Sequence, residues 1–452
     1  NNRVKPKDKE MFDALVYELT ERSDFARDPT TKFQAISQGA NRIAFMYTIG
    51  FNASSALVNA SQIPLFVLPY LSAEYGTANS VRSLNNARKI ITASNSLRTK
   101  DGKKLGKNLK RQDLVGEEVE YAGKPSLENY FVARFDEEQN RHIFDLRDDL
   151  QFPNAEMEQM IRDMQELVQL AADRNQLDQS YLSAELNMNQ SGRVKTAGDK
   201  FTHYGAWGFH NIENYNRQVT LATAYNLELE RMRKEKGRAE LTKEEKQQAA
   251  ETALYKTQQT NGGAVTETGA RVAQGDLGRV ALMYKNYGIQ MYYTMFKSFK
   301  TLIGSDPSLT KQDRVVALKQ LIGVHLTALL FAGVQGIPLY GAIKVIANMF
   351  LDDEEEDWDT LVRKQVGEGW YKGAVSELTG VDVSKRVALG QLLFQTNRYN
   401  VDASIEENIF FYLGGPAWST ALGVKRGMED IFVKGNLERG IESMVPTAFR
   451  NV

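Results

Sequence analysis

Two long stretches of this chain contain no Asp, Glu, Lys or Arg, although charged residues make up 25% of the 452-residue sequence. The first runs for 31 residues from Ile43 to Ala73, and the second for 24 residues from Gln320 to Ile343. One helix needs about 20 apolar residues to span a bilayer, so both stretches are long enough. They require either a body large enough to bury them or a route by which they can enter lipid.

The rest of the sequence is polar, with a mean hydropathy of −0.43. A permanently embedded protein would be more apolar overall, so we do not expect one here. Two interpretations stay open for the charge-free stretches: core helices of a large helical body, or core helices that later enter a membrane. The sequence alone favours the first, and polar residues inside the stretches, such as Asn52 and Gln335, fit both.

Small residues in the second stretch predict a close helix contact. Ala328, Ala332 and Gly336 lie four residues apart, so on a helix they share one face that a second helix can approach closely. Gly333 is a further small residue in this part of the predicted helix. Pro338 removes a backbone donor and is predicted to kink the helix.

Two prolines shape the expectation for the first stretch. Pro64 and Pro69 are predicted to break the segment QIPLFVLPYL into short pieces. Such a segment would form a bent or re-entrant hairpin rather than one straight span.

Apolar residues recur at helical spacing in most of the chain, which predicts a mainly α fold and an elongated multi-helix assembly protein. One predicted helix follows Pro153, and another runs from about His203 to Arg238. Two β-rich runs flank a polar turn and predict a small β-hairpin near residues 128–147.

Glycine and charge patterns divide the chain into four segments. Residues 1–96 hold the first charge-free stretch (43–73), and 97–152 hold a basic loop and the predicted hairpin. Residues 153–260 form long amphipathic helices, and 261–452 form a C-terminal helical region with the second stretch (320–343). Four glycines at the start of the last segment are the predicted hinge: Gly262, Gly263, Gly275 and Gly278.

A cluster of cations in the second segment predicts contacts with phosphate. Within sixteen residues, only Asp101 and Asp113 oppose seven basic side chains: Arg98, Lys100, Lys103, Lys104, Lys107, Lys110 and Arg111. Such a loop binds double-stranded DNA without sequence preference, or the headgroups of anionic lipids. An exposed solubilising loop is the alternative interpretation.

The composition leaves little room for site chemistry. The chain has no cysteine and four histidines, and its net charge is −1. His203, His210 and Glu213 have the spacing of one helix face, but their aromatic neighbours favour packing over a metal site. The acidic run Asp352–Asp357 could bind a divalent cation, although a solvated helix start is the favoured interpretation. We predict no cofactor, no metal and no catalytic residue.

Several segments together resemble the large internal virion proteins of short-tailed bacteriophages, the DNA-ejection proteins of the PLxRFG type. They are ANRIAFMYTIGFNASSALVNASQIPLFVLPYL, GDLGRVALMYKNYGIQMYYTMFKSF, residues 369–394 and residues 414–452. The PLxRFG motif itself is incomplete: Leu277 and Arg279 are present, but Asp276, Val280 and Ala281 replace its proline, phenylalanine and glycine. The resemblance covers about half of the chain and matches the C-terminal part of these proteins.

The resemblance implies a structural protein that is stored inside the capsid around the portal and ejected at infection. It would help to form a conduit for DNA across the host envelope. Its implied partners are other copies in a ring, other internal core proteins, portal or tail proteins, double-stranded DNA and the host membrane.

Two alternatives remain: a soluble virion scaffold, and a peptidoglycan-degrading enzyme of the lytic transglycosylase type. Such an enzyme needs a catalytic glutamate in a cleft. Glu442 is followed by Ser443 as that chemistry requires, but the surrounding sequence lacks the family's signature, so we interpret it as structural.

Overall fold

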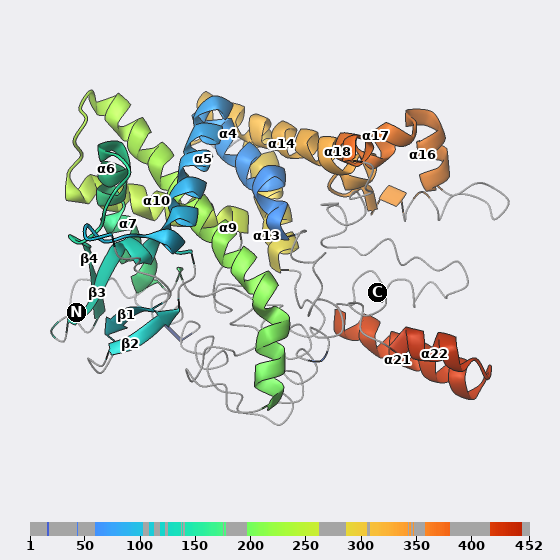
Figure 1. Cartoon of the computed structure of the whole chain (residues 1–452). Coiled ribbons are helices and arrows are strands. Elements are labelled where there is room, and N and C mark those ends of the chain that lie inside the picture. Colours follow the sequence, from blue (N-terminus) through green and yellow to red (C-terminus); the bar gives the residue numbers. More distant parts are fainter. Residues whose placement is uncertain are drawn as a thin grey trace.

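The computed structural model describes most of the central part of the chain and two C-terminal segments (Figure 1). The described residues are 16–17, 43, 59–102, 108–112, 118–122, 125–136, 138, 141–174, 176–177, 197–261, 286–304, 308–341, 343–344, 347, 358–379 and 416–444. These residues are mainly helical, with small antiparallel hairpins, which confirms the predicted fold class. The hinge glycines Gly262, Gly263, Gly275 and Gly278 and the acidic run Asp352–Asp357 lie outside them.

The centre of the larger core is α9 (Ala197–Lys236), which confirms the helix predicted for residues 203–238. Its apolar face is buried as the spacing predicted, and the opposite face is buried too, because α5 (Thr77–Ala93) and α10 (Lys243–Asn261) both pack against it. Buried Thr220 and Thr223 satisfy their hydroxyls by donating to carbonyls four residues back.

The helix predicted after Pro153 forms as two short helices, α6 (Ala155–Asp163) and α7 (Gln165–Asp173). Asn154 caps α6 by accepting from the amide of Met157 at 2.8 Å. Helix α7 packs on α10, and its buried face joins the same core as α5 and α9. One core therefore combines residues from Ile63 to Leu254.

The predicted hairpin forms between β3 (Phe131–Asp136) and β4 (Arg141–Leu146), with Phe131 opposite Leu146. A second hairpin was missed. Strands β1 (Asn108–Gln112) and β2 (Glu118–Ala122) pair within the stretch interpreted as a loop, so the basic segment is not wholly a loop. Short 3₁₀ turns connect this region: η2 (Ser94–Ser96) and η3 (Leu127–Tyr130).

The prediction that Pro64 and Pro69 break the first stretch is wrong for the part that the structure describes. A π-helix, η1 (Ile63–Val67), continues directly into α4 (Leu68–Tyr75). The wider π turn lets Leu68 donate to the carbonyl of Ile63, five residues back. Pro64 lies at the start of this run, where a missing donor is tolerated, whereas Pro69 lies inside it.

A smaller core forms where η1 meets α13 (Asn286–Ile303) and α14 (Lys311–Ala332). It holds Leu65 and Phe66 of η1 against two methionines of α13 and against Val324 and Ala328 of α14. In Figure 1, α4 lies between α5 and α14 and so connects the two cores.

Helix α14 ends at Gly333 instead of kinking at Pro338, which corrects that prediction. Gly333 has φ +66° and ψ −164°, an extended positive-φ conformation that only glycine adopts readily and that ends the helix. The 3₁₀ turn η5 (Val334–Gly336) follows. Gly333 and Gly373, which has φ +89°, pass so closely that a Cβ on Gly333 would lie 2.5 Å from the Gly373 nitrogen.

Three short helices follow: α16 (Trp358–Val366), α17 (Glu368–Lys372) and α18 (Ala374–Thr379). α17 and α18 contact α14, which places the Gly333–Gly373 contact in this junction. The last described elements are α21 (Pro416–Phe432) and α22 (Leu437–Met444), which form a helical hairpin. Gly427 and Gly440 make that hairpin tight, because a Cβ on Gly427 would lie 2.6 Å from the Gly440 carbonyl.

We predict that Gly333→Ala destabilises the protein by at least about 2 kcal/mol, because it adds backbone overlap to a strained φ. Gly367→Ala is the matched control: its φ is +82°, but the added methyl meets nothing within 4 Å, so a loss of only about 1 kcal/mol is expected. Melting temperatures of both variants test this. Equal losses would show that the Gly333–Gly373 approach is unimportant.

Candidate functional site

Helix α14 is positioned at its start by a complete capping box. The Thr310 hydroxyl accepts from the Asp313 amide at 3.1 Å, and the Asp313 carboxylate accepts from the Thr310 amide at 2.8 Å. The Thr310 hydroxyl also donates to the Asp313 carboxylate at 2.6 Å, and this bond, followed by the one from the Thr310 amide, lowers the pKa of Asp313 below its usual value. The start of α14 is therefore fixed just before its charge-free part.

One face of α14 packs against the η1–α4 run. A Cβ on Gly323 would lie 2.9 Å from Pro69 Cβ, so only glycine permits this approach. A proline cannot donate to the carbonyl four residues back, which for Pro69 is that of Leu65. The Thr327 hydroxyl of α14 lies 2.9 Å from this carbonyl oxygen and donates to it. Pro69 therefore leaves an acceptor that joins the two helices.

The small residues predicted for helix packing are buried. Ala328 and Ala332 have no exposed surface, and a Cβ on Gly336 would overlap Ala332 and lie 2.9 Å from the Ala328 carbonyl. Gly336 reaches them because the chain turns back at Gly333, not because α14 continues. Pro338 is also buried, beyond the end of the helix. These residues serve packing in this structure.

The opposite face of α14 is exposed and apolar. Five side chains at intervals of three and four residues are between 41% and 57% exposed: Val315, Leu318, Ile322, Leu326 and Leu330. We call these five residues the α14 stripe. The sequence analysis did not predict the α14 stripe because it considered only the small residues of this helix. The large apolar residues on the opposite face, at helical spacing, were the signal for it.

Among the described residues, α14 is the one helix long and apolar enough to cross a membrane. Core helices of soluble proteins pass the same test, but they are mostly buried, whereas only 22% of the apolar window of α14 is. The first charge-free stretch differs: of its described part, Leu65, Phe66 and Leu71 are almost fully buried. The two stretches therefore have different roles in this structure.

The predicted phosphate-binding cations are only partly described. Arg98 and Lys100 are exposed, and Arg98 donates to the Gly102 carbonyl at 3.4 Å. Lys110 and Arg111 belong to strand β1, opposite Glu120 and Val119 of β2. Lys103, Lys104 and Lys107 lie outside the described residues. The cluster stays a prediction.

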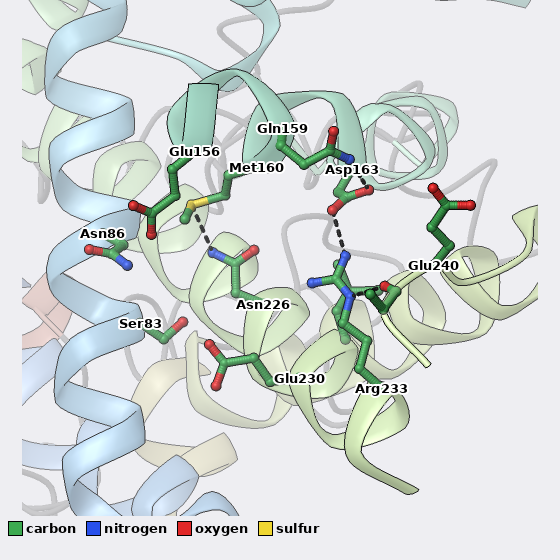
Figure 2. Close-up of a pocket in the computed structure, with 12 residues that line it drawn as sticks. Ser83, Asn86, Glu156, Gln159, Met160, Asp163, Asn226, Glu230, Arg233 and Glu240 are labelled. Carbon is green, nitrogen blue, oxygen red and sulfur yellow. Dashed lines mark hydrogen bonds and ion pairs between the residues drawn. The ribbon is translucent and has the colours of Figure 1, made fainter. Parts of the chain in front are cut away.

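A polar cavity of about 540 Å³ lies between α5, α6 and α9 (Figure 2). Its main charged contact is Asp163, which accepts from Arg233 at 2.6 Å and from Lys246 at 2.7 Å. The Asp163 carbonyl accepts from Tyr225 at 2.7 Å, and burial raises the pKa of that phenol, which keeps its proton. These contacts tie α6, α9 and α10 together, so the polar groups of the cavity have a structural role.

The other candidate residues do not gather into a described site. His210 is buried beside Asn214 on α9, and the side chain of His203 lies outside the described residues. In the part of the chain that the structure describes, no three His, Asp or Glu side chains are grouped to hold a metal. The backbone of Glu442 belongs to α22, but its side chain is not described.

Comparisons of the chain with protein-family models, curated proteins and solved structures found no match. The resemblance to phage ejection proteins stays a prediction from the sequence.

We predict that Asp163→Asn destabilises the protein by about 3 kcal/mol, because Arg233 and Lys246 lose their buried anion. Glu240→Gln, at the rim of the same cavity, is the matched control and should change stability by less than about 0.5 kcal/mol. Thermal unfolding of both variants measures the difference. A stable Asp163→Asn variant would contradict the structural role of this cluster.

Proposed function

We propose that the chain is a structural, non-enzymatic virion protein that meets a membrane through α14. In this proposal it is stored inside a phage capsid near the portal, as a ring with other copies and other core proteins. After ejection through the tail it contributes to a conduit for DNA across the host envelope. This is the function that the sequence resemblance implies.

The α14 stripe is the observation that carries the proposal. A contiguous apolar surface on a polar protein marks a contact with another protein or with a membrane. The α14 stripe follows the axis of a helix with no charged residue after Lys319. At 1.5 Å per residue, the uncharged part of α14 from Gln320 to Ala332 is about 20 Å long, roughly two thirds of the hydrocarbon thickness.

The buried face supports a helix that can leave its site. Gly323 and Ala328 let the backbones approach closely, and Val324 enters the smaller core with Leu321 and Phe331 packed against it. Only 22% of the apolar window of α14 is buried, and because hydrophobic stabilisation grows with buried area, the helix is held less strongly than a mostly buried core helix. A virion enzyme and a scaffold that never meets lipid are the rival functions, and no described site favours the enzyme.

We predict that replacing Ile322, Leu326 and Leu330 together with Gln reduces flotation with phosphatidylcholine vesicles at least about tenfold. Each exposed apolar side chain contributes to transfer into lipid, and none is needed for the core. The melting temperature should stay unchanged or rise. Ala328→Lys would not test this, since Ala328 is buried and its replacement would disturb folding.

The matched control replaces exposed apolar residues of the C-terminal hairpin, Val433, Leu437 and Ile441, with Gln. If flotation survives the α14 changes but is lost in the control, the membrane contact lies in the C-terminal hairpin and its assignment to α14 is wrong. Flotation of neither wild type nor variants would leave the scaffold as the better account.

The basic stretch gives a separate prediction about DNA. Replacing Lys103, Lys104 and Lys107 with Glu should weaken binding to duplex DNA at low salt and flatten its salt dependence, because fewer counterions are released. A filter-binding titration over several salt concentrations measures the slope. An unchanged slope would remove the assignment of this stretch to phosphate contacts.

A further inference from the structure

The turn end of the α13–α14 hairpin carries exposed cations beside exposed aromatic residues. Five basic residues lie between residues 297 and 319, and all are exposed: Lys297, Lys300, Lys311, Arg314 and Lys319. On α13, the neighbouring apolar side chains Phe296, Phe299 and Ile303 are between 49% and 65% exposed. Charge and apolar surface therefore occur together at this end.

Ion pairs with carboxylates do not explain these cations. None of the five forms an ion pair with a carboxylate in the described part of the chain. Lys311 and Arg314 lie in the first turn of α14, where the helix dipole disfavours positive charge. Lys297 lies 5.2 Å from the centre of the Tyr255 ring, and Arg314 donates to the Gly304 carbonyl at 3.0 Å. Neither contact supplies a carboxylate, and the compensation that remains is the dipole of α13, at whose C-terminal end Lys300 and the Gly304 carbonyl lie.

The distribution of charge along α14 is one-sided. All of its cations lie between Lys311 and Lys319, and its exposed residues beyond that point are apolar. A helix with cations at one end and an uncharged apolar stripe at the other matches the layers of a bilayer surface, where anionic headgroups border hydrocarbon. Exposed phenylalanine and tyrosine next to the cations fit the same boundary.

We propose that this end of the hairpin binds anionic lipid headgroups and so orients α14 toward the hydrocarbon. The inference rests on the proposed function, because it names the lipid class and the residues that would meet it first. Lys300, Lys311 and Lys319 supply the attraction, while the α14 stripe supplies the apolar contact. Neutral lipid is then bound through the stripe alone.

Flotation with two kinds of vesicle tests the inference: phosphatidylcholine alone, and an equimolar mixture with phosphatidylglycerol. Wild type should bind the mixed vesicles more tightly, and the excess should disappear between about 0.1 M and about 1 M salt. Replacing Lys300, Lys311 and Lys319 with Gln should reduce affinity for the mixed vesicles by on the order of a hundredfold, at about fivefold per cation. Binding to pure phosphatidylcholine should not change.

A matched control neutralises three exposed lysines elsewhere: Lys89 on α5, Lys234 on α9 and Lys425 on α21. This variant has the same net charge and should keep the preference for anionic vesicles. Loss of the preference in the control, or its survival in the hairpin variant, would overturn the inference.

The remaining outcomes separate the two proposals. Equal binding of wild type to both vesicles, abolished by the Gln changes in the α14 stripe, would overturn the lipid preference and leave the proposed function standing. If binding to anionic vesicles is unchanged by the Gln substitutions in the α14 stripe, the lipid preference stands and the proposed membrane contact through α14 is wrong. If the hairpin variant loses affinity for a short DNA duplex but not for vesicles, the partner is nucleic acid and the inference is wrong.

Discussion

The contact between α14 and the η1–α4 run is the interaction on which the exposed surface depends. Pro69 cannot donate to the Leu65 carbonyl, the Thr327 hydroxyl donates to it, and Gly323 lets the two helices approach. This contact uses the face of α14 that carries Gly323 and Thr327. The α14 stripe on the opposite face is therefore directed away from the body.

A helix that is apolar on both faces can bury only the face for which it has a partner. On the buried side, Gly323 and Ala328 give close backbone contact and Val324 enters the core, but only 22% of the apolar window of the helix is buried, so the stabilisation is modest. On the exposed side, the α14 stripe keeps apolar surface in water, which favours any partner that removes it. This imbalance is the physical basis of the proposal that α14 exchanges its protein contacts for lipid. Before any such exchange, the Gly333–Gly373 contact fixes the C-terminal end of α14.

The sequence predicted the elements whose signals are local and periodic. The long helix α9 and the β3–β4 hairpin followed from apolar spacing and from alternation around a polar turn. The prolines of the first stretch were misinterpreted, since a π turn and the hydroxyl of Thr327, distant in the sequence, compensate for the missing donors. Strands β1 and β2 were missed because Lys110 and Arg111 dominate a segment of low apolar content.

The candidate site was predicted in part. The charge-free stretch around α14 was recognised, and Ala328, Ala332 and Gly336 were expected to pack closely against another segment, but the exposed apolar face opposite them was not recognised. Which face of an all-apolar helix is buried depends on its neighbours in space, and periodicity alone does not determine it. The cations of the α13–α14 turn were not assigned to a site because loop glycines and lysines earlier in the chain gave a denser signal.

The most direct test of the account is the position of the α14 stripe when the protein is bound to vesicles. The chain has no cysteine, so Leu326→Cys can carry a single environment-sensitive fluorophore. Its emission should shift to the blue and become accessible to lipid-phase quenchers when phosphatidylcholine–phosphatidylglycerol vesicles are added, while the same label at Lys89→Cys stays in water. A label at residue 326 that remains quenched only from the aqueous phase, on vesicle-bound protein, would contradict the account.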